Sequence, residues 1–400
     1  MKKFVSFFLS LAFAGSTFAQ MSGYSSSQSD GTTLGANETL TANGIALGNA
    51  VKLRGYVDFM YGYRDMSEDL HDHKSFDTSA DVDFLFDLSP ITAELHLNVS
   101  DGDSDLLEQA FGRYSLNQDF HITFGRQVTN LGYDSDEVVN RKSVTTSYFF
   151  DQFFGSSKTL SAFTETVKEE ALEELINGGT VTIDGVTYTN ASLVSGNLPA
   201  ELSEDLTNLV SQLSANLRKN YVDGIRANYN NGMFGLSFGI HDGYWKNDDF
   251  NDNVAIDLAA SVMFFPGLEA RLGYAHQDND DQNIGHLNGW IAYNPGDLTL
   301  AFEFDNFDFD GDTELWDIML MANYQFTDFI GVTFRYSHED AENFIMPYDL
   351  DWTSDRFTLA LLFSVTENFG INVEYSHTEY DGDGWDDSAD EFYVQGLISY

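Results

Sequence analysis

Cysteine is absent from this chain of 400 residues. Its absence excludes a disulfide framework, a zinc–thiolate site and a thiol nucleophile. Basic residues are scarce, since 19 Lys and Arg stand against 64 Asp and Glu, for a formal net charge of −45. Because nucleic-acid binding needs basic side chains that displace counterions, we expect no nucleic-acid partner.

Long apolar runs are also missing, apart from one near the N-terminus. There Lys2 and Lys3 precede the apolar run 4–13, and Thr17-Phe18-Ala19 precedes Gln20. This pattern is typical of a cleaved secretory signal, and the run is too short to span a bilayer as a helix. We therefore expect residues 1–19 to be a signal peptide of an exported chain. No later run reaches about 18 apolar residues, which excludes membrane-spanning helices.

Aromatic residues are abundant, at 15% of the chain, with 34 Phe and 20 Tyr. From Val51 onward they and other apolar residues alternate with polar ones, as in the final stretch 391–400. Alternation with period two predicts β-strands with two different faces. A last strand with a free edge invites unwanted pairing, whereas in a closed barrel it pairs with the first strand. The strong periodicity also argues against the disorder that so acidic a chain would otherwise suggest.

The connections between these strands alternate in length. Tight turns such as 230–232, 266–267 and 294–297 separate long polar loops at 64–80, 132–220, 241–253, 277–284, 305–313, 339–352 and 378–389. Tight turns on one rim and long loops on the other are typical of outer-membrane barrels, and a soluble sandwich has no need of them. We predict an all-β transmembrane antiparallel up-and-down barrel of about 16 strands over residues 51–400. Residues 20–50, rich in Ser, Thr, Gly and Asn, are expected to be a flexible leader, with a plug or a periplasmic contact as the alternative.

The loop at 132–220 is far longer than the others. Apolar residues recur at helical spacing over 160–176, Asp184-Gly185 marks a hairpin within 181–188, and Pro199 opens a second amphipathic segment that reaches 217. We therefore predict an ordered insert of two helices and a hairpin after the fifth strand. Three hypotheses stay open: a lid or constriction of the channel, an extracellular cap or subunit contact, and a disordered surface loop.

These features resemble a Gram-negative outer-membrane porin of the sixteen-stranded type. The resemblance rests on the signal peptide, the alternation of loops and turns, and the terminal aromatic strand. It also rests on two motifs, Phe124-Gly125-Arg126-Gln127 before Leu131-Gly132, and Asp223-Gly224-Ile225-Arg226. The resemblance implies that the third long loop, here 132–220, folds into the lumen, and that the protein forms a homotrimer. It also implies recognition by the barrel-assembly machinery through a C-terminal signal made of Phe392, Val394, Ile398 and Tyr400.

Charged residues on the polar strand faces are candidates for the pore lining. The basic candidates are Arg54, Arg113, Arg226, Arg271, Arg335 and Arg356, and the acidic ones are Glu94, Glu269, Glu303 and Glu374. In the lumen they stay hydrated, whereas an arginine facing lipid costs roughly 2–4 kcal/mol at the bilayer midplane. Either they pair with one another along the wall, or the basic wall faces acidic residues of the insert, namely Asp134, Asp136, Glu137 and Asp151. The second arrangement would orient polar solutes across the pore.

The long loops are strongly acidic, so we expect cations to gather at the mouth and the channel to prefer them. Asp308, Asp310 and Asp312 imitate the start of a calcium loop, but no Glu stands at the twelfth position, where Asp317 falls inside a strand. A solvated acidic loop face is the favoured interpretation. The alternative is a divalent cation such as Ca²⁺ that bridges the loops to one another or to anionic lipid, and we expect no other cofactor. We interpret the nine histidines, among them His71, His73, His241, His276 and His338, as surface residues without a ligand spacing.

The leading functional hypothesis is a passive diffusion porin of the outer membrane, embedded among lipid and lipopolysaccharide, for small hydrophilic solutes and ions. The alternatives are a substrate-selective channel and a plugged structural or adhesive barrel. An outer-membrane enzyme such as a lipase needs a Ser or Asp together with a His on the lipid-facing side. The outward positions supply no such set, so we expect no enzymatic activity.

Overall fold

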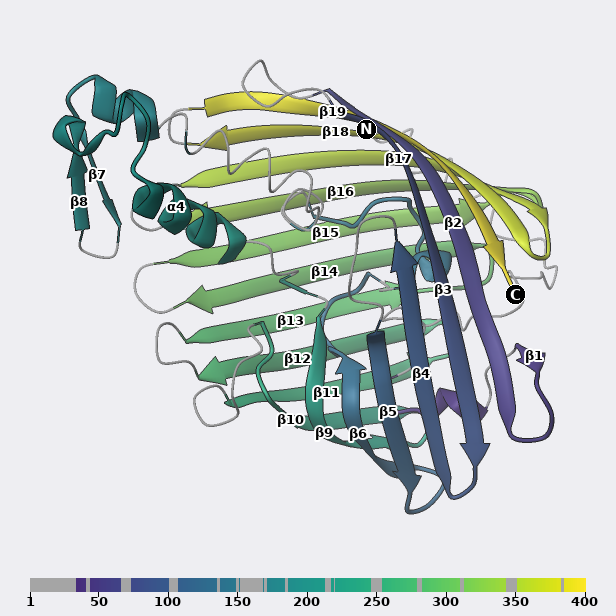
Figure 1. The fold of residues 1–400 in the computed structure, drawn as a ribbon. Coiled ribbons are helices and arrows are strands. Elements are labelled where there is room, and N and C mark those ends of the chain that lie inside the picture. The colour runs from purple at the N-terminus through teal and green to yellow at the C-terminus, as the bar shows by residue number, and fades with distance from the viewer. Residues whose placement is uncertain are drawn as a thin grey trace.

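Sixteen long antiparallel strands close into a barrel in the computed structural model (Figure 1). The structure describes residues 34–40, 44–65, 73–100, 107–134, 137–148, 151, 168, 171–183, 186–212, 217–218, 220–245, 254–278, 283–309, 313–342, 351–382 and 385–400. A seventeenth, two-residue strand, β1 (Ile45–Ala46), pairs with β2. Among the helices of these residues, none has the length and apolar content to span a bilayer.

Each barrel strand pairs with the next along the chain, and the insert lies between the fifth and the sixth. The strands are β2 (Val51–Asp65), β3 (His73–Leu88), β4 (Ile91–Ser100), β5 (Leu107–Ser115), β6 (Phe120–Val128), β9 (Tyr221–Asn230), β10 (Phe234–His241), β11 (Val254–Phe265), β12 (Leu268–Asp278), β13 (Ile284–Tyr293), β14 (Leu298–Phe309), β15 (Glu314–Gln325), β16 (Ile330–Glu342), β17 (Trp352–Thr366), β18 (Phe369–Gly382) and β19 (Trp385–Ser399). The predicted barrel of about 16 strands is confirmed.

The barrel closes between its last and first strands. β19 pairs with β2 from Asp390 opposite Asp65 to Ser399 opposite Tyr56. Tyr400 extends this pairing, since its backbone N–H donates to the carbonyl of Gly55 at 3.0 Å and its carbonyl accepts from the N–H of Gly55 at 3.1 Å. Closure therefore removes the free edge that a terminal strand would otherwise leave.

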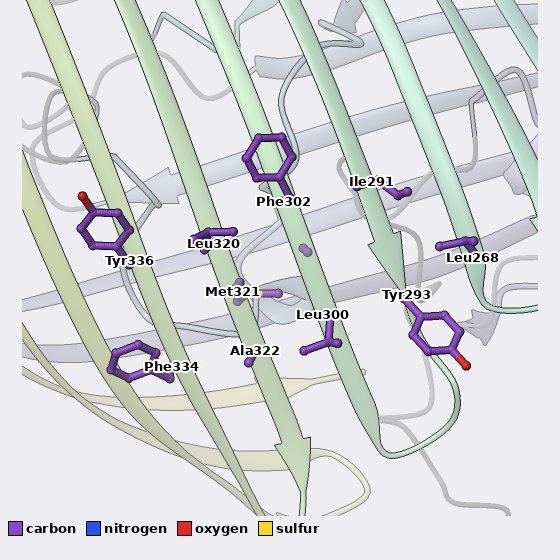
Figure 2. A pocket seen from close by; sticks show the side chains of 11 residues that line it. Leu268, Ile291, Tyr293, Leu300, Phe302, Leu320, Met321, Ala322, Phe334 and Tyr336 are labelled. Carbon is purple, nitrogen blue, oxygen red and sulfur yellow. The ribbon is translucent and has the colours of Figure 1, made fainter. Parts of the chain in front are cut away.

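The two faces of the strands differ as the alternation predicts. In β10, Phe234, Leu236, Phe238 and Ile240 are exposed on the outer face, and the residues between them are buried. Figure 2 shows outward side chains of β12 to β16, such as Phe302 and Leu320, around a hollow of about 620 Å³. The outer face is thus apolar, as a lipid-facing surface requires, and the charged side chains turn inward.

The connections obey the predicted alternation, but the strands are longer than expected on the long-loop side. The expected loop at 64–80 shrinks to the interval between β2 and β3, and the expected loop at 378–389 shrinks to residues 383–384 between β18 and β19. Backbone pairing between antiparallel neighbours does not depend on side-chain polarity. The ladder therefore continues through the acidic stretches for as long as both strands extend.

Part of the predicted leader lies inside the barrel. Leu34 is 3% exposed, and its carbonyl accepts a hydrogen bond from Asn230 Nδ2 at 2.7 Å. Thr39, in the 3₁₀ turn η1 (Glu38–Leu40), donates to Glu94 on the inner wall at 2.5 Å. Residues 34–40 therefore contact the lumenal wall near the short-turn rim.

The distal half of the insert has a small core of its own. It contains a helical turn at 171–176, the hairpin of β7 (Thr180–Ile183) and β8 (Val186–Thr189), the 3₁₀ turn η3 (Asn190–Ser192) and α4 (Ala200–Gln212). A buried cluster joins Ala171, Leu175, Val181, Tyr188, Leu202 and Leu206. Figure 1 shows this unit beyond the strand ends on the long-loop side. Most of the first predicted helix, 160–176, lies outside the described residues.

Candidate functional site

The proximal part of the insert runs inside the barrel, and we call residues 129–134 and 137–148 the lumenal segment. It leaves β6 at Thr129, whose N–H donates to the carbonyl of Asn220 at 2.8 Å. The hydroxyl of Thr129 also donates to the carbonyl of Arg218 at 3.2 Å. These bonds hold the two ends of the insert together at its neck, before the chain turns into the lumen.

Apolar contacts seat the lumenal segment on the inner wall. Leu131 is fully buried against Gly273 of β12. A Cβ atom added to Gly273 would lie only 2.2 Å from Cδ2 of Leu131. A side chain at position 273 would therefore require the Leu131 side chain to move. Tyr133 meets the ring of Trp290 of β13 edge-on, with centroids 5.6 Å apart, and Tyr148 belongs to the same buried cluster. The segment therefore packs against β12 to β14 rather than crossing the lumen unsupported.

Wall carboxylates accept hydrogen bonds from the backbone of the lumenal segment. Glu303 accepts from the N–H of Tyr133 and from Asn288 Nδ2, the latter at 2.9 Å. Glu374 accepts from the N–H of Val144 at 2.5 Å, from the N–H of Thr145 at 3.3 Å and from the Thr145 hydroxyl. Hydrogen bonds to charged groups contribute about 1.5–3 kcal/mol each. These two glutamates thus fasten the segment at two points of the wall.

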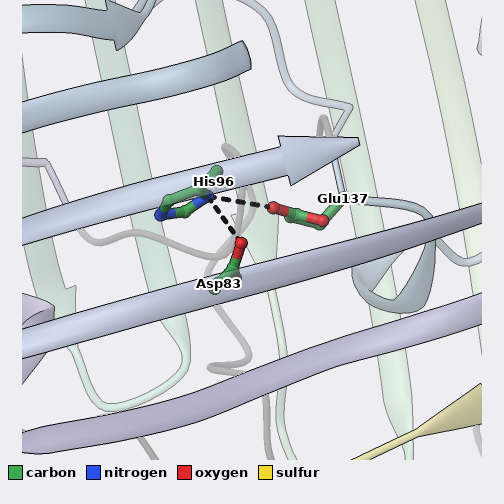
Figure 3. A group of neighbouring side chains, drawn as sticks. All are labelled: Asp83, His96 and Glu137. Atoms are coloured by element: carbon green, nitrogen blue, oxygen red, sulfur yellow. Dashed lines mark ion pairs between the residues drawn. The ribbon is translucent and has the colours of Figure 1, made fainter. Parts of the chain in front are cut away.

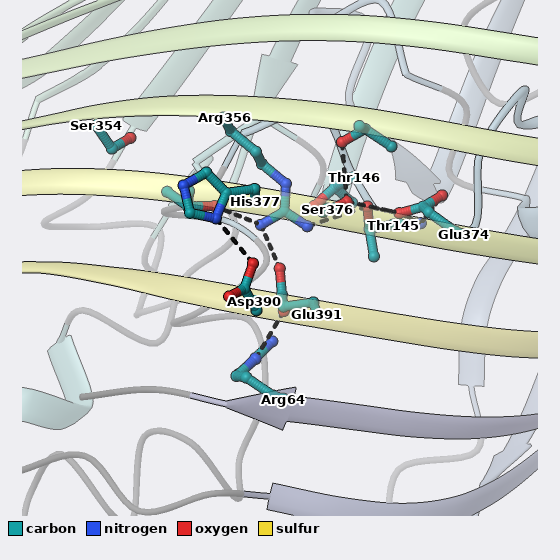
Figure 4. Close-up of polar contacts among 12 residues, drawn as sticks. Arg64, Thr145, Thr146, Ser354, Arg356, Glu374, Ser376, His377, Asp390 and Glu391 are labelled. Atoms are coloured by element: carbon teal, nitrogen blue, oxygen red, sulfur yellow. Dashed lines mark hydrogen bonds and ion pairs between the residues drawn. The ribbon is translucent and has the colours of Figure 1, made fainter. Parts of the chain in front are cut away.

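Two wall arginines donate hydrogen bonds to other polar groups of the same stretch. Arg335 donates to the hydroxyl of Ser143 at 2.7 Å and to the carbonyls of Thr145 and Thr146 at 3.0 and 2.6 Å. Arg356 donates to the Thr145 hydroxyl at 3.2 Å (Figure 4). Glutamates and arginines together therefore satisfy both donors and acceptors of residues 143–146.

Behind this contact lies a charge network along the wall. Arg356 Nη1 is 2.6 Å from Glu391, and Glu391 also accepts from Arg64 Nε at 2.7 Å (Figure 4). The three side chains come from β17, β19 and β2, so the network spans the seam where the barrel closes. The seam and the lumenal segment are therefore joined through Arg356.

Arg218 anchors the far end of the insert, and the sequence analysis did not select it. Its guanidinium forms ion pairs with Asp151 at 2.7 Å, with Asp305 at 3.5 Å and with Asp317, and lies 3.7 Å from the ring centroid of Tyr148. Burial by itself lowers the pKa of Arg218, but the surrounding carboxylates hold it well above its ordinary value. Arg218 stands outside any strand, so period-two alternation gave no signal for it.

The six predicted basic residues all lie on the inner face and are at most 8% exposed. Three of them pair with wall carboxylates: Arg54 with Asp83 at 2.7 Å, Arg226 with Asp257 at 2.8 Å, and Arg113 with Glu94. Arg271 lies 4.0 Å from Glu269 and 4.9 Å from the centroid of Trp290. Arg335 and Arg356 bind the lumenal segment. The arrangement agrees with pairing along the wall for Arg54, Arg113 and Arg226.

The predicted contact between a basic wall and an acidic insert takes a different form. Asp134 accepts from the N–H of Ser147 at 2.5 Å, and Asp151 pairs with Arg218, both within the insert. Glu137 lies beside His96 of the wall, 3.7 Å from its Nδ1. Backbone groups of the insert, invisible to an analysis of side-chain charge, occupy much of the wall's hydrogen-bonding capacity. Asp136 lies outside the described residues.

Several histidines are buried, which corrects their interpretation as surface residues. His241 is fully buried 2.6 Å from Asp257, and His286 is fully buried 2.7 Å from Asp305. His96 is 2% exposed, and its Nε2 lies 2.8 Å from Glu94. The available signal was strand parity, because Glu94 and His96 stand two residues apart on the same face. His71 lies outside the described residues.

The remaining predicted site residues lie on the outside or at the rims. Phe392, Val394 and Ile398 point outward and are 36–44% exposed, and Tyr400 donates its hydroxyl to the carbonyl of Asp81 at 3.3 Å. Asp308 is an exposed residue of β14, opposite Glu314 of β15, and is therefore not in the loop conformation of a calcium site. Asp310 and Asp312 lie outside the described residues.

Comparison with known proteins supports the fold alone. No family model matches the chain, and no curated protein matches it in sequence. Solved structures do match: OmpT of Vibrio cholerae is 12% identical, with a TM-score of 0.54 over 89% of this chain and 99% of that one. The anion-selective porin from Comamonas acidovorans gives 12% and 0.54 over 88% and 99%, and Salmonella typhi OmpF in complex with daunomycin gives 11% and 0.58 over 88% and 98%. The predicted resemblance is thus confirmed as a porin fold.

Proposed function

We propose that the protein is an outer-membrane porin that forms a water-filled channel for passive diffusion of small hydrophilic solutes and ions. The observation that carries this proposal is the lumenal segment, held inside a closed barrel by Glu303, Glu374, Arg335 and Arg356. A fixed polar segment along a polar wall narrows a pore without sealing it with apolar groups. The apolar outer face and polar inner face suit a barrel with water inside and lipid outside.

Cation preference is the second part of the proposal. The chain carries 64 acidic and 19 basic residues, and the described strand ends on the long-loop side include the exposed residues Asp278, Asp308 and Asp381. A mouth of one charge sign concentrates counterions. The inner arginines act in the opposite direction but most of them are paired with carboxylates. The fold does not decide ion selectivity, since the similar Comamonas acidovorans structure is described as anion-selective.

The proposal includes the surroundings of the channel. Residues 1–19 would be removed on export to the outer membrane of a Gram-negative cell, and the outer face would contact lipid and lipopolysaccharide. Phe392, Val394, Ile398 and Tyr400 would be recognised by the barrel-assembly machinery. A homotrimer is supported by the trimer form in which OmpT of Vibrio cholerae has been solved, with a TM-score of 0.52. We propose no enzymatic activity.

A plugged barrel is the second candidate, because two segments occupy the lumen. Residues 34–40 lie against the wall near the short turns, and the lumenal segment lies against β12 to β18. In this alternative the insert and the long loops serve an adhesive or structural role. A substrate-selective channel would instead use the fixed constriction as a binding track.

Single-channel conductance of the refolded chain in planar bilayers, in a potassium chloride gradient, tests these candidates. Stable conductance steps with a cation-selective reversal potential are expected of the open porin. Anion selectivity would mean that the lumenal arginines outweigh the acidic mouth. Absence of steps from a barrel verified by its heat-modifiable electrophoretic mobility would favour the plugged barrel, and a chain lacking residues 34–40 would then show whether this segment is the plug.

A further inference from the structure

Five ligand-type side chains converge where the lumenal segment meets β3, β4 and β5. Asp81 and Asp83 come from β3, His96 from β4, Glu108 from β5 and Glu137 from the lumenal segment. Figure 3 shows Asp83, His96 and Glu137 pointing toward one another from two strands and the insert. None of them belongs to the contacts that fasten residues 143–146 to β16, β17 and β18. The cluster is therefore a separate feature of the lumen.

The ligand atoms form two overlapping triads. One is Asp83, His96 and Glu137, the other is Asp81, Glu108 and Glu137, and within each triad the atoms lie within 4.8 Å of one another. Two oxygens on opposite sides of a calcium-sized cation, bonded at 2.3–2.6 Å, stand roughly 4.6–5.2 Å apart. Each triad is thus no wider than the coordination sphere of one ion, and Glu137 is common to both.

The environment of Asp81 is an independent indication that this cluster binds a positive charge. It is fully buried, and neither of its carboxylate oxygens has a hydrogen-bond partner among the residues that the structure describes. Asp83 is also fully buried, and while its Oδ2 accepts from Arg54 Nε at 2.7 Å, its Oδ1 has no such partner. A buried carboxylate without compensation is costly, and binding of a cation removes that cost.

The backbone is shaped to bring Glu108 into the cluster. β4 and β5 pair His96 with Gln109 and Leu97 with Leu107, so a bulge leaves Glu108 as the extra residue. Strict alternation would turn Glu108 outward beside Ala110 and Tyr114. A bulge re-aims a side chain, and here the carboxylate of Glu108 reaches the triad with Asp81 and Glu137.

His96 has the surroundings of a metal-bound imidazole. Its Nε2 lies 2.8 Å from Glu94, while Nδ1 lies 3.1 Å from Asp83 Oδ1 and 3.7 Å from Glu137 Oε1. Although Asp83 Oδ1 is near Nδ1, the two do not have hydrogen-bond geometry. A carboxylate that accepts from one ring nitrogen is the usual support of a histidine ligand. The other nitrogen, Nδ1, lies 3.2 Å from Gln109 Nε2 and would exchange this amide contact for the ion. The rival arrangement is a doubly protonated His96 between Glu94 and Asp83.

We propose that this cluster binds a divalent cation through Asp81, Asp83, His96, Glu108 and Glu137. Mixed carboxylate and imidazole donors suit an ion such as Mn²⁺, which accepts both oxygen and nitrogen ligands. Because Glu137 belongs to the insert and the other ligands to the wall, the ion joins the lumenal segment to β3–β5. Bound cation thus fixes the lumenal segment at a third point of the wall, apart from Glu303 on β14 and Glu374 on β18. This site does not depend on the proposed channel function.

Mn²⁺ titration of the refolded full-length chain tests the site. The chain is first treated with a chelator, and its folding is verified by heat-modifiable mobility and circular dichroism. Free Mn²⁺ is then followed by its EPR signal. We expect saturable binding, with Glu137→Gln weakening it roughly tenfold or more, since loss of a second-shell partner alone costs 10–100-fold. Electron spin echo modulation from a coordinated imidazole nitrogen is expected in the wild-type chain and lost in His96→Gln.

Two variants control for non-specific binding to so acidic a protein. Glu367→Gln removes an exposed carboxylate on the short-turn rim, and His338→Gln removes a histidine that lies 3.0 Å from Asp355 away from the cluster. Both are expected to bind Mn²⁺ as the wild type does. If Glu137→Gln does not fold, Glu108→Gln replaces it, because Glu108 lies at the strand end beside the bulge.

Mn²⁺ should also raise the resistance of the wild-type barrel to urea, because a ligand that binds only the folded state stabilises it, and this gain should be absent from Glu137→Gln. No binding by the folded wild-type chain overturns the proposal. So does wild-type affinity in Glu137→Gln and Glu108→Gln. Absence of the nitrogen modulation from the wild-type chain overturns the assignment of His96 and supports its protonated form.

Discussion

Arg218 stacks on the ring of Tyr148, with the guanidinium carbon 3.7 Å from the ring centroid. In the sequence, the two residues flank the distal unit of the insert and are 70 positions apart. Their contact, together with the ion pair of Arg218 and Asp317, holds the base of that unit against β14 and β15. The distal unit is therefore attached to the barrel at a defined point.

Replacement of Arg218 by Gln should strongly destabilise the folded state. It leaves the buried carboxylates of Asp317, Asp305 and Asp151 without their cation, and the loss of one partner from a buried pair costs about 3–5 kcal/mol. Equilibrium urea unfolding in lipid vesicles measures the change. The control is Arg126→Gln, whose pair with Asp223 at 3.3 Å is exposed and should contribute about 0–1 kcal/mol. Equal effects of the two variants would contradict the anchoring role of Arg218.

An arginine introduced on the outer face should destabilise the folded barrel only where that face lies in the bilayer core. Leu320 stands in the middle of β15 and is 48% exposed on the apolar face. Leu320→Arg should reduce the unfolding free energy in vesicles by about 2–4 kcal/mol. Asp328→Arg, in the turn between β15 and β16, should leave it nearly unchanged because the side chain stays in water. A neutral result for Leu320→Arg would argue against a lipid-facing outer wall.

The seam of the barrel should depend on Gly55. A Cβ on this residue would lie 2.2 Å from the carbonyl oxygen of Asp81 and 2.8 Å from the hydroxyl of Tyr400. Gly55→Ala should therefore separate β2 from β3 or displace Tyr400, at a cost of about 1–3 kcal/mol. The fraction of chain that reaches the heat-modifiable folded form measures it. Gly289→Ala serves as control, since the atom nearest its added Cβ is at 3.4 Å.

Neutralisation of the acidic rim should weaken cation preference. The triple variant of Asp278→Asn, Asp308→Asn and Asp381→Asn removes three exposed charges at the long-loop ends of β12, β14 and β18. The reversal potential in a potassium chloride gradient should shift toward zero. The shift should shrink at high salt, because the screening length falls to about 3 Å at 1 M. A reversal potential that these substitutions do not move would assign selectivity to the lumen instead.

The architecture was predictable because it depends on local periodicity. Alternation in stretches such as β10 indicates which residues face lipid, and the alternation of short and long connections indicates how the strands are joined. The same parity placed Arg54, Arg335 and Glu374 on the inner face. The ends of the strands were less predictable, because backbone pairing continues through acidic residues that the sequence pattern assigns to loops.

The contacts of the lumenal segment were not predictable from the sequence. Glu303 and Glu374 hold backbone N–H groups, which every residue carries, so side-chain chemistry could not reveal them. Arg218 and Asp317 meet across 99 positions of sequence, and Asp83 and Glu137 meet because the insert turns into the lumen. Glu108 reaches its cluster only through a bulge, which reverses the face that alternation assigns to it.

The sequence by itself determined that the chain forms a closed barrel with an apolar outside and a charged inside, because a period of two expresses the geometry of each strand separately. Only the tertiary structure decided how that interior is filled. The position of the lumenal segment, the partners of the wall charges and the cluster around His96 depend on distances between residues far apart in the chain. Such distances follow from barrel closure and from the path of the insert, neither of which is encoded within any one strand.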